Sequence, residues 1–142
     1  VNDRIDVALA VDADGVHLGQ DDDMPVQLAR KLLGPARILG ISAGNQVEAE
    51  AAIAASADYI SVGAIYATRA KSDAGAPIGI RFLSELAVRT TIPLIAIGGI
   101  TVQNVSPVIQ AGAVGVAVIT AVVSADDIAA ATRDILNAIQ SQ

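Results

Sequence analysis

Short apolar runs rich in β-branched residues alternate with segments of helical periodicity along the chain, and this alternation limits the folds open to it. The runs are nearly continuous apolar stretches, which is typical of strands buried on both faces. We expect strands at residues 16–20, 37–42, 58–66, 92–100 and 115–120. We expect helices over residues 25–34, 46–57, 80–90, 101–112 and 125–140. The pattern predicts a single α/β domain over residues 1–142, built of βα units around a parallel sheet.

Turn-forming and capping residues mark the expected helix ends. Pro25 suits a first helical turn, and Gly34 and Gly112 suit positions just after a helix. Thr101 and Ser124 are residue types that cap helix N-termini, so we predict them as N-caps of the last two helices.

Composition excludes several classes of partner. The chain is 53% hydrophobic, yet it holds only two tyrosines, one phenylalanine and no tryptophan, too few aromatic rings for a base-stacking platform or a membrane belt. Its net charge of -6 opposes binding to nucleic acid or to an anionic membrane. The absence of cysteine excludes disulfides and thiolate metal sites. We therefore expect small-molecule partners and take a cytoplasmic location as the default.

Two architectures suit a series of βα units: a (β/α)8 barrel of the TIM type and an open doubly wound sheet. No Gly-x-Gly-x-x-Gly sequence follows any expected strand, which removes the main sign of a dinucleotide-binding sheet. The barrel is therefore favoured, and its chemistry is expected at the C-terminal ends of the strands.

The residues at those strand ends suit phosphate and cation chemistry. Gly98 and Gly99 follow a buried run and allow backbone N–H groups to approach a ligand closely, although a simple tight turn is an equal alternative. Replacing Gly99 by valine is expected to weaken phosphate binding and to leave the fold largely intact. The other polar residues expected at strand ends include Asp21, Asp22, Ser42, Thr68, Lys71 and Thr120.

Six segments together resemble the thiamine-phosphate synthase family over essentially the whole chain. They are VNDR (1–4), ADGVHLGQDD (13–22), GIS (40–42), ADYISVGAIYATRAK (57–71), AIGGIT (96–101) and GVAVIT (115–120). The resemblance implies a (β/α)8 transferase that joins hydroxymethylpyrimidine pyrophosphate to thiazole phosphate and releases pyrophosphate with the help of Mg²⁺.

The resemblance also implies roles for particular residues. Asp3 and Asp22 match the aspartates that bind Mg²⁺, a metal that prefers hard oxygen ligands. Lys71 and Ser42 match catalytic residues that contact pyrophosphate. The other residues matching substrate-binding positions are Asn2 and His17 near the pyrimidine, Thr68 beside Lys71, and Gly99, Ile119 and Thr120 around the thiazole phosphate.

Members of this family are longer, and the resemblance implies an incomplete barrel here. We expect five full strands plus a strand stub at residues 1–3, without the first two βα units. The stub is expected to lie beside the run at 16–20. The Gln-x-Arg-x-Lys strand that the family uses to hold pyrophosphate does not occur in these residues, so the chain alone is expected to be inactive and prone to self-association, with a homo-oligomer as one arrangement.

Two alternatives from other classes remain open. One is a thiazole tautomerase, an isomerase on the same barrel, for which the resemblance implies a histidine where this chain has Gly44. The other is a phosphate-binding remnant without turnover, which is favoured by Ala70 in place of a threonine in the Thr68–Lys71 loop.

Overall fold

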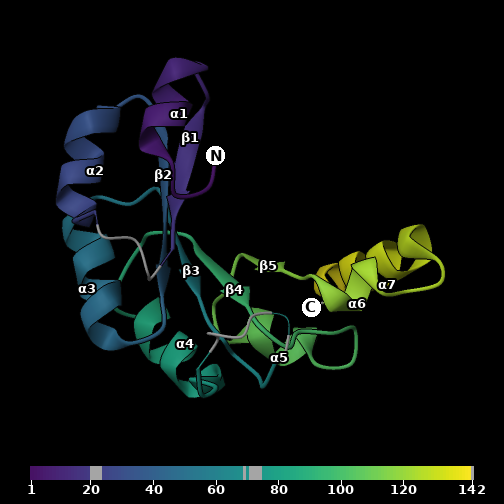
Figure 1. The fold of residues 1–142 in the computed structure, drawn as a ribbon. Coiled ribbons are helices and arrows are strands. Elements are labelled where there is room, and N and C mark those ends of the chain that lie inside the picture. Colours follow the sequence, from purple (N-terminus) through teal and green to yellow (C-terminus); the bar gives the residue numbers. More distant parts are fainter. Residues whose placement is uncertain (20–23, 69, 71–74, 142) are drawn as a thin grey trace. The chain divides into compact units, whose positions relative to one another are not determined.

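Strands and helices alternate through the computed structural model, which describes residues 1–19, 24–68, 70 and 75–141 (Figure 1). Five strands follow one another in the sheet in the order of the sequence, β1-β2-β3-β4-β5. The contacts divide the chain into two compact units, Val1–Ser61 and Val62–Gln142. The predicted α/β fold with parallel strands and alternating helices is confirmed, while the single domain over residues 1–142 stays a prediction.

The first unit is built around two paired strands. Its elements are α1 (Ile5–Ala10), β1 (Gly15–Leu18), α2 (Val26–Leu33), β2 (Ile38–Ala43), α3 (Gln46–Ala54) and the start of β3 (Tyr59–Val62). β1 and β2 are parallel, with Gly15 opposite Ile38 and Leu18 opposite Ile41. α2 and α3 pack on each other and on β2 (Figure 1). Apolar side chains such as Leu18, Leu39 and Ile60 are buried in this unit, as continuous apolar strands require.

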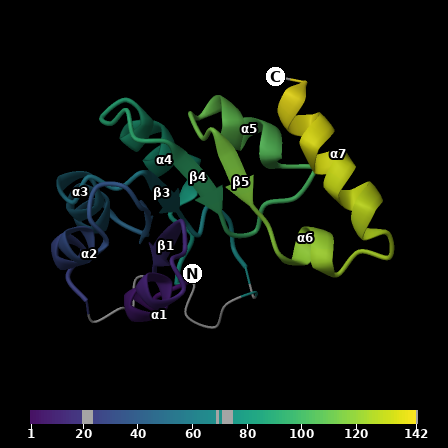
Figure 2. The same cartoon turned by 90° about the horizontal axis from the view of Figure 1, so that it is seen from above.

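The second unit has the same alternation. Its elements are α4 (Gly79–Ala87), β4 (Leu94–Ile97), α5 (Val105–Gln110), β5 (Gly115–Ala117), α6 (Thr120–Val123) and α7 (Ile128–Gln140). β4 and β5 are parallel, with Ile97 opposite Ala117. α7 packs on α5 and α6 (Figure 2). The longest described helix is α7, with 13 residues, and none of the described helices is long and apolar enough to cross a membrane.

The structure corrects the predicted helix starts. α5 begins at Val105, four residues after Thr101, and the Thr101 N–H donates to the side chain of Asn104, which is the N-cap. Ser124 ends α6 instead of starting α7, whose N-cap is Asp127. Two helices, α1 and α6, were not predicted from the sequence; they are only six and four residues long. Such short helices lack the two or more turns over which an apolar period becomes visible.

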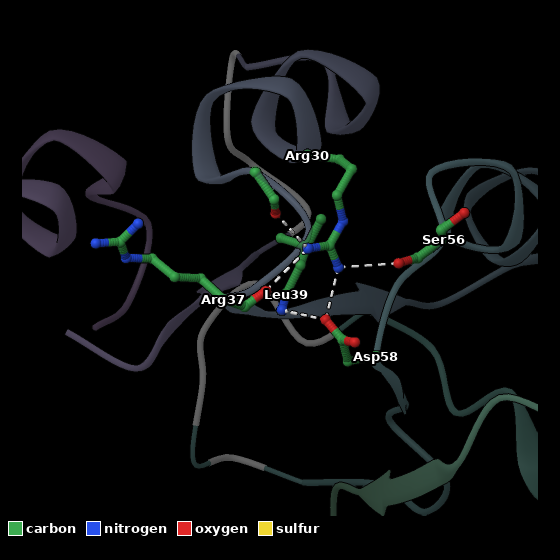
Figure 3. Close-up of polar contacts among 6 residues, drawn as sticks. Arg30, Arg37, Leu39, Ser56 and Asp58 are labelled. Carbon is green, nitrogen blue, oxygen red and sulfur yellow. Dashed lines mark hydrogen bonds and ion pairs between the residues drawn. The ribbon is translucent and has the colours of Figure 1, made fainter. Parts of the chain in front are cut away.

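One arginine joins three segments at the N-terminal ends of β2 and β3 (Figure 3). The Arg30 guanidinium donates to the carbonyls of Gly34 and Arg37 at 3.0 and 2.9 Å, and to the Ser56 carbonyl at 2.9 Å. It also donates to the Asp58 carboxylate at 2.6 Å, and the same carboxylate oxygen accepts the Leu39 N–H at 2.7 Å. We call this group of six residues the Arg30 clamp. It ties the end of α2 to the start of β2 and to the turn before β3.

Candidate functional site

The strand stub at the start of the chain lies beside β1, as predicted. Asn2 and His17 form an isolated parallel bridge. The His17 N–H donates to the Val1 carbonyl at 2.9 Å, and the Asp3 N–H donates to the His17 carbonyl at 2.8 Å. The first unit therefore brings Asn2, Asp3 and His17 together, three residues that the resemblance assigns to one site.

The Asp3 carboxylate is held by two donors. Its Oδ1 accepts the Gly19 N–H at 2.8 Å, and its Oδ2 accepts the Asn2 side-chain amide at 2.5 Å. Asp3 has a φ of 59°, a left-handed conformation that aspartate and asparagine adopt more readily than most residues. Each oxygen retains acceptor capacity beyond the one bond described, so the carboxylate is oriented and still able to bind a cation.

His17 connects two neighbouring strands through its ring nitrogens. Its Nε2 lies 3.0 Å from Ser42 Oγ at the end of β2. Its Nδ1 lies 2.9 Å from the Tyr59 hydroxyl oxygen, at the start of β3, and the two rings are stacked with centroids 5.6 Å apart. All three side chains are half-buried. Ser42 thus joins the group that contains Asn2, Asp3 and His17.

Tyr59 was not predicted from the sequence to be a site residue. Its ring lies directly over Gly40 of β2, where a Cβ atom would come within 2.1 Å of the tyrosine Cζ. Burial raises the pKa of Tyr59 above its ordinary value. The available sequence signal was Gly40 itself, because a glycine inside a strand often marks the close approach of another group.

In the second unit, the Gly98–Gly99 turn follows β4. Both glycines have positive φ, 98° and 64°. The Asn104 side chain holds this turn, because its amide donates to the Gly99 carbonyl at 3.0 Å and its oxygen accepts the Thr101 N–H at 2.7 Å. Asn104 is a further residue that the sequence analysis did not single out.

Gly99 is required by the fold itself. A Cβ at this position would lie 2.6 Å from the Ala67 carbonyl oxygen and 2.8 Å from Tyr66 Cβ. The expectation that valine at position 99 leaves the fold largely intact is therefore revised, since the backbone of residue 67 would have to move.

The remaining described site residues lie in the same unit. Ile119 and Thr120 follow β5, and Ile119 is 50% exposed. Because Ile97 of β4 is opposite Ala117 of the parallel β5, the residues after both strands emerge at the same edge of the sheet. Thr68 Oγ1 accepts the Ala70 N–H at 3.1 Å.

Two of the predicted site residues, Asp22 and Lys71, lie outside the described residues. The expectation that Asp3 and Asp22 both bind Mg²⁺ is therefore untested. Within the described part of the chain, no group of three or more histidine, aspartate or glutamate side chains is placed to hold a metal ion.

Comparisons with known proteins agree on one family. The family model described as thiamine monophosphate synthase matches residues 1–122. A thiamine-phosphate synthase from Moorella thermoacetica is 52% identical over 139 residues, which are 98% of this chain and 66% of that protein. A thiamine-phosphate synthase from Chloroflexus aurantiacus is 56% identical over 135 residues, 95% of this chain and 62% of that protein.

A comparison with solved structures gives a similar protein as well. The solved structure of a thiamine phosphate pyrophosphorylase from Pyrococcus furiosus superposes with a TM-score of 0.86 at 40% identity, and covers 99% of this chain and 66% of that one. This similarity confirms the TIM-barrel type of α/β fold. The chain spans about two thirds or less of the length of these three proteins.

Proposed function

Because the chain belongs to the thiamine monophosphate synthase family, we propose that the protein containing it couples hydroxymethylpyrimidine pyrophosphate to thiazole phosphate, forming thiamine phosphate and releasing pyrophosphate. The observation that carries this proposal is the family match over residues 1–122. The names of the similar proteins support a transferase over the isomerase alternative. Since the chain spans about two thirds of those proteins, the activity is proposed for the whole protein.

We assign Mg²⁺ binding to Asp3 and Asp22. The chemistry of the described donor fits this metal, because the Asp3 carboxylate is a hard oxygen ligand oriented by the Gly19 N–H and the Asn2 amide. Bound Mg²⁺ would supply positive charge to the departing pyrophosphate. Asn2 holds the carboxylate in place, and we also assign it a contact with the pyrimidine substrate.

We assign four residues to binding of the pyrimidine pyrophosphate: Ser42, His17, Thr68 and Lys71. Ser42 donates its hydroxyl hydrogen to a phosphoryl oxygen, Lys71 supplies a compact positive charge, and Thr68 supplies a further polar contact. His17 orients Ser42, as their 3.0 Å contact supports. Loss of pyrophosphate leaves a pyrimidine methylene cation, which the thiazole nitrogen attacks. These residues act by positioning and electrostatics, without a covalent enzyme intermediate.

The thiazole phosphate is assigned to the backbone at the ends of β4 and β5. Gly99, Ile119 and Thr120 offer N–H groups, which bind phosphate oxygens without requiring particular side chains. The parallel pairing of Ile97 with Ala117 supports this assignment, because the two loops leave the sheet at one edge.

The experiment that tests the function is a product assay on the full-length protein that contains this chain. With Mg²⁺ and both substrates, thiamine phosphate and pyrophosphate are expected in equal amounts. An isomerised thiazole phosphate as sole product would indicate a thiazole tautomerase instead. Phosphate binding without any product would indicate a phosphate-binding remnant of the fold that has no turnover. Residues 1–142 alone are expected to be inactive, because they lack a Gln-x-Arg-x-Lys segment.

Replacing Asp3 by asparagine is expected to raise the Mg²⁺ concentration needed for half-maximal turnover by about tenfold or more, because one anionic metal ligand becomes neutral. Asparagine keeps an acceptor for the Gly19 N–H and tolerates the positive φ, so the fold is expected to remain. A magnesium titration of turnover measures the effect.

The matched control is Asp6→Asn. Asp6 is an exposed carboxylate three residues along the chain that pairs with Arg4. Its replacement is expected to leave the magnesium titration unchanged. Equal shifts in the two variants would show that Asp3 contributes only to the general negative charge.

A further inference from the structure

Tyr59 contacts the proposed site through His17 and has no role in the reaction as described above. Its hydroxyl oxygen lies 2.9 Å from His17 Nδ1, while the other ring nitrogen, Nε2, lies 3.0 Å from Ser42 Oγ. Tyr59, His17 and Ser42 come from β3, β1 and the end of β2. Among the contacts of the described residues, the imidazole thus has a hydroxyl group at each ring nitrogen.

The position of the tyrosine ring depends on Gly40. A Cβ on residue 40 would meet the ring at 2.1 to 2.4 Å, at Cζ, Oη and Cε1. Only a glycine in this strand leaves space for the ring to cross β2 and reach the imidazole. The contact between Tyr59 and His17 is therefore built into the packing of the strands.

The chemistry of the three groups decides which atom donates each hydrogen bond. A neutral imidazole has one acceptor nitrogen and one N–H donor, so only one of the two hydroxyl groups can donate to it. A phenol, with a pKa of about 10, is a far stronger acid than an aliphatic hydroxyl group, and so is the better donor. Burial raises the pKa of Tyr59 further, which keeps the phenol protonated at neutral pH.

We propose that Tyr59 is a positioning residue that donates to His17 Nδ1 and so holds the imidazole in its Nε2–H tautomer. Ser42 Oγ then accepts the Nε2–H, and the hydrogen of the serine hydroxyl points to a phosphoryl oxygen. The last step rests on the proposed function, whereas the tautomer does not. A histidine tautomer is commonly set by the bond that its other nitrogen makes. A serine hydroxyl that already accepts from Nε2 is preorganised to donate to an anion.

The first test reads the tautomer directly. His17 is the one histidine of this chain, so its imidazole nitrogen signals need no further assignment, and in a longer form of the protein their loss in His17→Gln identifies them. Long-range ¹H–¹⁵N spectra of the wild type are expected to show protonated Nε2 and unprotonated Nδ1. In Tyr59→Phe, which keeps the ring and removes only the hydroxyl, we expect a mixture of tautomers.

The second test measures the consequence for Ser42 in the full-length protein. Binding of inorganic pyrophosphate in the presence of Mg²⁺ is expected to weaken about three- to tenfold in Tyr59→Phe, because a mixture of tautomers leaves the Ser42 hydroxyl without a fixed direction. This loss is the size of one ordinary hydrogen bond and smaller than a full bond to a charged group. In a Ser42→Ala background, Tyr59→Phe is expected to have no further effect, because the hydroxyl it orients is absent. Gly40→Ala is expected to resemble Tyr59→Phe, although it retains the tyrosine.

The outcomes separate the two proposals. A wild-type spectrum with protonated Nδ1, or an unchanged tautomer in Tyr59→Phe, overturns the positioning role whatever the activity. Additive losses from Tyr59→Phe and Ser42→Ala overturn the route through Ser42. The expected tautomer change together with a wild type that binds no pyrophosphate overturns the proposed function and leaves the control of His17 by Tyr59 supported.

Discussion

Replacing Gly99 by alanine is expected to lower the free energy of unfolding by about 3 kcal/mol, and replacement by valine by more. Two effects add at this position. Its φ of 64° is costly for any residue with a Cβ, and that Cβ would lie 2.6 Å from the Ala67 carbonyl oxygen. Because the contact is with backbone, it can be relieved only by moving the chain at residue 67. Denaturant unfolding measures the loss.

Gly75 provides the matched control for the two effects. It has a φ of 66°, nearly that of Gly99, but a Cβ there would meet no atom of the described residues within 4 Å. Gly75→Ala is therefore expected to cost only the conformational strain, about 1 kcal/mol. Equal losses at the two positions would mean that the contact with Ala67 contributes nothing.

The same turn shows why strand ends were harder to predict than strands. Residues 92–100 read as one apolar run, and Ile100 is indeed buried, yet β4 stops at Ile97. The positive φ of Gly98 turns the chain there, so Ile100 reaches the core from a loop. Apolar content predicts burial, and it indicates a strand only where the backbone stays extended.

The residue types alone did not determine where the helices begin, because the start depends on the local path of the backbone. Thr101 and Asn104 are both plausible N-caps from sequence. Asn104 takes the N-cap position without a side-chain capping bond. Its oxygen accepts the Thr101 N–H, and its amide holds the Gly98–Gly99 turn through the Gly99 carbonyl. This second interaction depends on where the turn lies in space, so sequence alone could not reveal it.

The candidate site was likewise only partly predictable from the sequence. The resemblance placed His17 near the pyrimidine and gave Ser42 a contact with pyrophosphate. The structure brings the two side chains within 3.0 Å because β1 and β2 are adjacent parallel strands. Tyr59 belongs to another strand, and its place beside His17 depends on the space above Gly40. A pairwise fit of this kind between distant residues leaves no periodic pattern in the sequence.

Loss of Arg30 is expected to destabilise the first unit by about 2 to 3 kcal/mol, as measured by denaturant unfolding of Arg30→Met. The Arg30 clamp places one guanidinium on three backbone carbonyls and on the Asp58 carboxylate (Figure 3). Methionine retains much of the apolar stem and leaves these acceptors without their donor. Arg30→Lys is expected to recover only part of the loss, because a point charge cannot replace a planar fork with several donors.

The effect of pH gives an independent measure of the same contact. Burial acts to raise the pKa of Asp58, but the Leu39 N–H and the Arg30 guanidinium together lower it below its ordinary value. A carboxyl group whose pKa is lower in the folded state stabilises the fold above its unfolded pKa of about 3.9, and this stability is lost as the pH falls through the folded value. Stability of Arg30→Met is therefore expected to fall less steeply than that of the wild type below about pH 4.

Arg81→Met is the control for both measurements. Arg81 and Glu85 form an ion pair of 2.7 Å, close to the 2.6 Å of Arg30 and Asp58, but their side chains are 91% and 58% exposed against 19% and 47%. An exposed helical pair of this kind contributes little to stability, because water screens the attraction between the two charges. If Arg81→Met and Arg30→Met lost equal stability, the carbonyl bonds of the Arg30 clamp would contribute nothing. The connection of α2 to the start of β2 and to the turn before β3 would then have to be attributed to apolar packing alone.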